Sequence, residues 1–286
     1  MSEASVIHDI GYQRYTGPRL GRGAVFGALY IHGLRAAYGL GRSAKAKIFP
    51  WLVVGIITLV AVILAAVRAQ TGIIPLNYIR FADSMSWLII FFVAIVAPEL
   101  VSRDMRAGVL PLYFSRPLRA SDYIGAKVAA MVTAVWALLA GPQLIIFLGA
   151  AFTTKEGMSG VWHELGDLLP AWGYSLLWAL VFTGIGLLVA SLTGKRAFAA
   201  GGIVAVFLMT TPIVGVMSIL PSSTAQHLAG LTSPMSLING VGQWLLDGGD
   251  GLNIGSFGPV YGIEAVTVIL ACLLLLLARY RKVASL

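Results

Sequence analysis

The sequence predicts an all-α membrane protein that crosses the bilayer several times. Of its 286 residues, 58% are hydrophobic and only 11% are charged, and the mean hydropathy is +0.86. A soluble domain carries about 25% charged residues. Several stretches without charge approach or exceed the roughly 20 residues that a helix needs to cross a bilayer core of about 30 Å. These observations exclude the soluble classes and indicate a polytopic helical protein.

Two short tails and a surface helix are predicted to flank the membrane domain of residues 48–280. Residues 1–21 form an N-terminal tail, 22–47 an amphipathic helix on the inner membrane surface, and 281–286 a cytoplasmic tail. In the surface helix His32, Arg35 and Arg42 share one face, while the other face is favoured by Phe26, Tyr30, Leu34, Ala37 and Tyr38. A bilayer would support such a helix despite its glycines. The alternative for this segment is a disordered basic tail.

We predict six transmembrane spans, at about 48–68, 82–101, 128–151, 169–192, 198–220 and 259–278. The second is short, because only 15 uncharged residues separate Asp83 from Glu99. It must therefore recruit Ile79 and Phe81 or draw Glu99 toward the inner interface. In the third span, Gly141-Pro142 predicts a kink.

The uncharged stretch from Ala197 to Leu246 is too long for one span. In one interpretation 198–220 crosses, and the turn at Pro221–Thr224 leads into a re-entrant hairpin on the outer side. In the other interpretation both halves of the stretch cross, which gives seven spans.

The basic residues favour six spans. In that topology 17 of the 20 Lys and Arg residues lie inside, and only Arg68, Arg80 and Lys155 lie outside. A seventh span would place the C-terminal basic cluster outside, against the positive-inside rule. We therefore expect both termini in the cytoplasm, in the cell (plasma or inner) membrane. The net charge of +8 is then explained by orientation and by contact with anionic lipids, not by nucleic acid.

A charged segment, residues 99–127, separates the second and third spans. It reads Glu99…Arg103-Asp104…Arg106-Ala107-Gly108-Val109-Leu110, then Ser115-Arg116-Pro117-Leu118-Arg119 and Tyr123-Ile124-Gly125-Ala126-Lys127. Glu99 and Arg103 are four residues apart and can pair on a helix. That pair either anchors the segment or is an ordinary solvated surface pair.

This segment, in this place, resembles the permease subunit of the type-2 ABC exporter family. The topology is similar over residues 22–280 and the motif over residues 99–127. The family has an acidic/basic–Gly–small–Leu stretch, a Ser-Arg-Pro turn and a later Gly-x-Lys. Pro111 departs from the family, which more often carries a helix-compatible polar residue there, so the helix of this segment is expected to end near Leu110.

The resemblance implies a cytoplasmic coupling helix at residues 102–113 that docks on a separate ATPase dimer. It also implies a second permease chain, identical or related, and alternating access driven by ATP. The ATPase-coupling residues would be Arg103, Asp104, Arg106, Gly108, Leu110, Lys195 and Arg196. Glu99 and Arg35 would anchor the coupling helix.

The chain lacks the residues of an enzyme that hydrolyses ATP. Gly194-Lys195 is followed by Arg, with no glycine five residues earlier, so there is no phosphate-binding loop. We expect ATP and Mg²⁺ on the partner subunit and no cofactor on this chain. His163-Glu164 with Asp167 is a weak candidate for a metal site in an outer loop, although a solvated loop or helix cap is the simpler interpretation. Cys272 is the only cysteine, which excludes an internal disulfide.

Glu264 lies five residues into the last predicted span and is costly there unless it sits near an interface or faces protein or a cavity. It either contacts substrate or makes an interfacial or interhelical contact. The aromatic residues of the spans would suit an amphipathic or lipid-like substrate. The rival function is that of a membrane anchor or sensor that recruits an ATPase without moving a solute.

Overall fold

The computed structural model describes residues 17, 21–102, 104, 118–246 and 252–284, and within them all regular structure is helical. Five helices are long and apolar enough to cross a membrane, and the bent pair α3–α4 makes a sixth if it is one span. The elements are α1 (Arg22–Ala37), α2 (Ala44–Thr71), α3 (Tyr78–Ser84), α4 (Ser86–Leu100), α7 (Ala120–Thr153), α8 (Met158–Ser191), α9 (Arg196–Ser218), α10 (Ser223–Leu228), η1 (Ala229–Thr232), α11 (Pro234–Leu246), η2 (Gly255–Phe257) and α12 (Gly258–Ala284).

The short helix α3 leads into α4, in the region of the predicted second span. Helix α4 alone has 15 residues, about 22 Å of helix, and α3 precedes it across a bend of 52°. Phe81 of α3 is fully buried, and Glu99 near the end of α4 is 8% exposed. Residues before Asp83, with Ile79 and Phe81 among them, thus form a separate short helix, which would extend the second span if α3 and α4 cross together.

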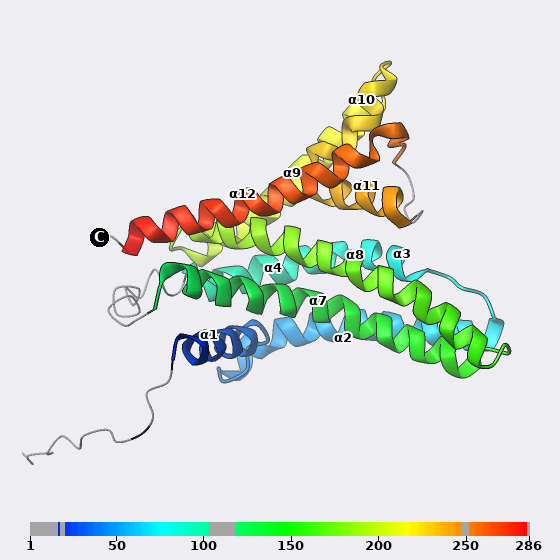
Figure 1. Ribbon diagram of the computed structural model, residues 1–286, viewed down its shortest axis with the longest axis horizontal. Coiled ribbons are helices and arrows are strands. Elements are labelled where there is room, and N and C mark those ends of the chain that lie inside the picture. The colour runs from blue at the N-terminus through cyan, green and yellow to red at the C-terminus, as the bar shows by residue number, and fades with distance from the viewer. Residues whose placement is uncertain (1–16, 18–20, 103, 105–117, 247–251, 285–286) are drawn as a thin grey trace, which may run out of the picture.

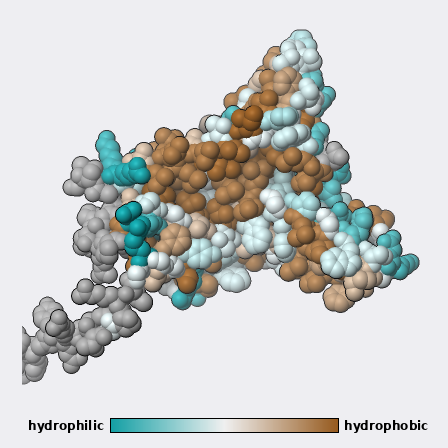
Figure 2. Space-filling view, viewed as in Figure 1, coloured by the Kyte–Doolittle hydropathy of each residue, from teal (hydrophilic) through white to brown (hydrophobic). Residues whose placement is uncertain are grey.

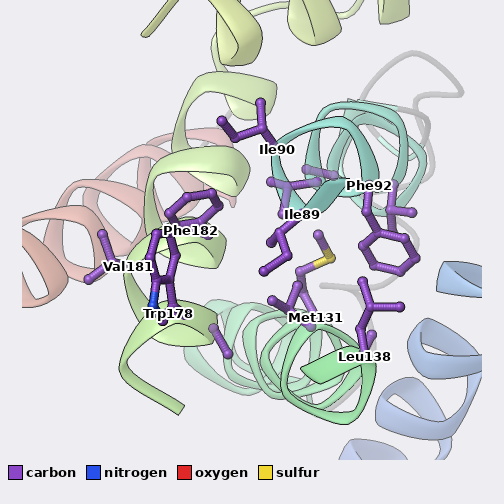
Figure 3. Close-up of a cluster of buried hydrophobic side chains, with 14 of the residues drawn as sticks. Ile89, Ile90, Phe92, Met131, Leu138, Trp178, Val181 and Phe182 are labelled. Carbon is purple, nitrogen blue, oxygen red and sulfur yellow. The ribbon is translucent and has the colours of Figure 1, made fainter. Parts of the chain in front are cut away.

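Helix α4 lies at the centre of the bundle. Most of its residues are buried. The exposed apolar residues Trp87, Phe91 and Ile95 recur every four positions and so lie on one face. Figure 3 shows Ile89, Ile90 and Phe92 of α4 facing side chains of α7 and α8. At Gly186 of α8 an added Cβ would overlap the side chain of Val93. A small residue there lets α4 and α8 pack closely, which is a common device in membrane helix pairs.

The two longest helices, α7 and α8, each have 34 residues. Helix α7 continues through Pro142, where the sequence predicted a kink. Helix α8 begins at Met158 and not near residue 169, so His163, Glu164 and Asp167 lie in its first turns. The interpretation of these three residues as part of an outer loop is therefore wrong, because the helix extends beyond the apolar stretch that marks the span.

The surface helix also differs in its bounds. The predicted helix over 22–47 ends at Ala37 as α1, and α2 starts at Ala44 after a turn that contains Gly39 and Gly41 at positive φ. An added Cβ on Gly39 would lie 2.5 Å from the backbone oxygen of Ala46. This turn separates α1 from α2, so the two helices are free to run in different directions.

The uncharged stretch after α9 folds as a hairpin. Ser233, which precedes α11, lies 3.3 Å from Thr210 of α9 through their hydroxyl oxygens. Thr210 is eight residues before the end of α9 at Ser218, about 12 Å of helix. The chain therefore returns some way into the bundle after α10 and leaves again through α11, which lies beside α12 (Figure 1). Within the described residues α11 has 13 residues, too few for a further span.

The helices alternate in direction, so the connections gather at two ends (Figure 1). One end, here named the basic end, carries α1, the end of α4, the start of α7, the turn at 192–195 and the last turns of α12. The opposite end carries 72–77, 154–157 and the hairpin. In Figure 2 hydrophobic side chains form a broad band over the visible face of the bundle, between hydrophilic side chains at the two ends. That pattern is typical of a multi-pass membrane protein.

Candidate functional site

The basic end holds an ion triad around the buried Glu99 carboxylate. Arg42, in the turn after α1, places Nη1 2.6 Å from Glu99 Oε2, and Arg196, the first residue of α9, pairs with Oε1. The Glu99 side chain is 6% exposed. One carboxylate thus joins three segments that are far apart in sequence. Because removing one partner of a buried pair leaves an uncompensated charge, each of these residues helps to fix the geometry of the basic end.

A second cluster of polar contacts holds the start of the charged segment, at residues 102 and 104. Lys127 of α7 places Nζ 2.8 Å from Asp104 Oδ2, and the Tyr123 hydroxyl donates to the same oxygen at 2.6 Å. Lys127 is 5% exposed. Two residues earlier, the Ser102 hydroxyl donates to the carbonyl of Ala190 at 2.7 Å. The start of the charged segment is therefore bound to both α7 and α8.

Helix α1 is held against the first half of α7. Arg22 forms a bidentate ion pair with Asp122, with N···O distances of 2.7 and 2.8 Å. Further along, an added Cβ on Gly33 would lie 2.9 Å from Cβ of Ala130. The Tyr38 hydroxyl donates to the carbonyl of Ala134 at 2.9 Å. Burial raises the pKa of Tyr38 to about 12.

The outward face of α1 and its turn forms a shallow basic depression. Its volume is about 420 Å³, and its lining includes Ile31, His32, Arg35 and Arg42. His32 and Arg35 are exposed, in line with the polar face that the sequence indicated. Among the described residues the ion-pair partners of Glu99 are Arg42 and Arg196, while Arg35 lies in this depression.

Four of the seven residues implied to couple to an ATPase lie outside the described residues: Arg103, Arg106, Gly108 and Leu110. The other three are Asp104, Lys195 and Arg196, and all are at the basic end. Lys195 is exposed and lies 5.5 Å over the ring of Phe198, which is itself 69% exposed. The cation of Lys195 in the turn at 192–195 and the aromatic ring of Phe198 in the first turn of α9 thus lie at the surface, close to Arg196 of the Glu99 triad.

Sequence reasoning missed a polar network at the opposite end. Glu164 of α8 pairs with both Nη atoms of Arg68, and the Tyr78 hydroxyl donates to it at 2.9 Å. Gln143, which is fully buried in α7, donates to the carbonyl of Tyr78 at 2.9 Å and accepts from Ser175. A lone Gln inside an apolar run was the available signal, because a buried amide requires partners.

A second branch of this network joins α3, α8 and α11. The Tyr174 hydroxyl donates to Asp83 Oδ1 at 2.6 Å and lies 3.3 Å from Asn239 Oδ1. These contacts connect the hairpin to the second span. Their partners come from elements that are more than 60 residues apart in sequence, so spacing alone could not reveal them.

The remaining candidates make fewer contacts. His163 Nδ1 lies 3.7 Å from Asp167 Oδ2, and both side chains are exposed. In the described part of the chain no group of His, Cys, Asp and Glu is arranged to hold a metal ion. Glu264 is half-buried in α12, and no hydrogen bond or ion pair to another described residue is seen for it.

No protein-family model matches the chain, and comparison with curated proteins finds no match. Its function is therefore inferred from the residues and their geometry.

Proposed function

We propose that this protein is the permease subunit of an ABC exporter, driven by a separate cytoplasmic ATPase. The main support for the proposal is that several helices hold the start of the charged segment at the basic end. Ser102 binds α8 and Asp104 binds α7, while Glu99 just before them joins Arg42 and Arg196. A force applied to this segment would reach the turn after α1 together with α7, α8 and α9.

The arrangement of the helices supports the same proposal. Up to six spans, with α1 and the end of α12 at one end of the bundle, agree with the topology that the family resemblance implies. Helices α2 and α9 leave most of their apolar surface uncovered, with only 22% and 17% of their most apolar windows buried. Lipid and a second permease chain, identical or related, would cover these faces. In the proposed orientation the basic end faces the cytoplasm.

The test begins with the partner. The full-length chain, captured from its native membranes, should bring down an ABC-type ATPase, and the two should co-purify as a dimer of each when expressed together. Alone, the chain should hydrolyse no ATP. Together in proteoliposomes they should catalyse ATP-dependent flux. Association without flux would instead favour a membrane anchor or sensor.

Two variants then locate the contact. Arg106→Glu or Gly108→Trp should leave insertion and expression intact but release the ATPase or uncouple hydrolysis from transport. A charge reversal in a desolvated polar interface costs roughly 2–5 kcal/mol, which is about 30-fold or more in affinity. Lys155→Glu, in the exposed connection at the opposite end, is the matched control. If both variants bind and transport as the control does, the segment is not the coupling element.

A further inference from the structure

Two cavities of opposite character adjoin at the end of the bundle away from the basic end. The larger is a groove of about 780 Å³ between α8, α11 and α12. The smaller is a pocket of about 260 Å³ between the end of α2, α3 and α8. Pro170 and Leu246 line both, so the two cavities lie next to each other. A volume of several hundred Å³ is typical of small-molecule sites.

The groove is almost entirely apolar. Its walls include Tyr174 and Leu177 of α8, Trp244 of α11, and Ile263 and Val266 of α12. Ile263 and Val266 are 68% and 56% exposed. Such walls accept an alkyl chain or an aromatic body, and they offer few groups to pair with a polar one.

The pocket supplies charge, and its balance is negative. It contains two carboxylates, Glu164 and Asp167, against one guanidinium, Arg68. Both Nη atoms of Arg68 already bind Glu164, so Arg68 has little to offer a bound anion. His163 Nδ1 lies 3.7 Å from Asp167 Oδ2, and the Asp167 side chain is 60% exposed. The Asp167 carboxylate is therefore accessible to a ligand cation.

We propose that this joint site binds an amphipathic cation, a small molecule with one ammonium group and an apolar body. The apolar body lies in the groove, and the ammonium group lies in the pocket beside Asp167. A cation that passes between the groove and the pocket would also be attracted to the aromatic faces of Tyr174 and Trp244. The idea that such a molecule is also transported rests on the proposed function, whereas its binding does not.

Binding is measured on the full-length chain in phosphatidylcholine nanodiscs, without any ATPase. The probe is radiolabelled dodecyltrimethylammonium, with binding to empty nanodiscs subtracted. We expect saturable binding that unlabelled probe displaces, and much weaker displacement by dodecyl sulfate or dodecanol of equal chain length. Equal displacement by all three would show a groove filled by apolar chains without preference for charge, and would overturn the proposal.

Two variants with matched controls separate the parts of the site. Asp167→Asn should weaken probe binding about two- to fivefold, the scale of an exposed charge pair, while Glu156→Gln on the neighbouring exposed connection should not. Val266→Trp should fill the groove and abolish saturable binding, while Leu274→Trp, exposed elsewhere on α12, should not. Unchanged binding in both Asp167→Asn and Val266→Trp refutes the site. Because no ATPase is present, these results are independent of whether the proposed function holds.

Discussion

At the scale of single residues, the most informative group is the Glu99 carboxylate. The sequence placed it at the end of a short span, with Arg103 as its helical partner. Arg103 lies outside the described residues, and the described partners are Arg42 and Arg196, from two other segments. A buried carboxylate between two arginines costs desolvation that the pairing must offset. Compared with an apolar contact of similar size, the paired carboxylate therefore adds little net stability, and its main effect is to hold the geometry of the basic end.

Removing that carboxylate should be damaging. In Glu99→Gln, Arg42 and Arg196 face each other without a counter-charge, so the midpoint of thermal unfolding in nanodiscs should fall. Breaking a fully buried pair costs roughly 3–5 kcal/mol, and the effect should lie at or below the low end of this range because Arg196 is 51% exposed.

A double variant that also removes Arg42 tests whether the three charges interact. Glu99→Gln combined with Arg42→Gln should be less destabilised than Glu99→Gln alone, since one unpaired charge is removed. Glu156→Gln, on an exposed connection, controls for the loss of a carboxylate. Additive losses in the double variant would show that the three charges do not interact.

At the scale of elements, the position of α1 is set by its packing against α7. The sequence predicted a polar face with His32 and Arg35, and both are exposed. What the pattern did not show is the contact with α7, made by Arg22, Gly33 and Tyr38. Through this contact α1 lies next to the residues that hold Asp104.

The close approach at Gly33 gives a direct test. Gly33→Leu should push α1 away from Ala130 and raise the rate of tryptic cleavage at Arg35 and Arg42 several-fold. Gly27→Leu is the control, because nothing lies within 4 Å of its added Cβ. Both changes raise helix propensity by a similar amount, near 1 kcal/mol, so a difference between them reports the packing. Equal cleavage of the two variants would mean that α1 does not depend on this contact.

At the scale of the whole molecule, the alternation of the helices and the distribution of the basic residues indicate the same orientation of the protein in the membrane. Helix α1 and the last turns of α12 lie at the same end of the bundle (Figure 1), and the hairpin lies at the other. The proposed orientation can be tested without knowing the substrate. It requires only that two exposed serines, Ser43 and Ser223, lie on opposite sides of the membrane.

Labelling in intact cells distinguishes the two sides. In a Cys272→Ala background, Ser223→Cys should react with an impermeant maleimide, and Ser43→Cys should react only after the cells are opened. Labelling of Ser43→Cys in intact cells would contradict the six-span orientation.

The sequence by itself determined the class of the protein and most of its spans. Apolar runs of sufficient length predict transmembrane helices because no other backbone arrangement of that composition satisfies its hydrogen bonds in lipid. It also identified the 221–246 stretch as a hairpin, since basic residues in the flanking segments disfavour a seventh span. Helix ends were less accurate, as at Met158, because a helix can continue past the apolar run that marks the membrane.

Only the tertiary structure decided which polar residues meet. Glu99 with Arg196, Lys127 with Asp104, and Glu164 with Arg68 each join different elements. The adjoining groove and pocket likewise depend on how α8, α11 and α12 are placed. Hydrophobic periodicity fixes which segments are helices, but the pairing of distant charges depends on the rotation and crossing of packed helices. A single sequence carries no local signal for those quantities.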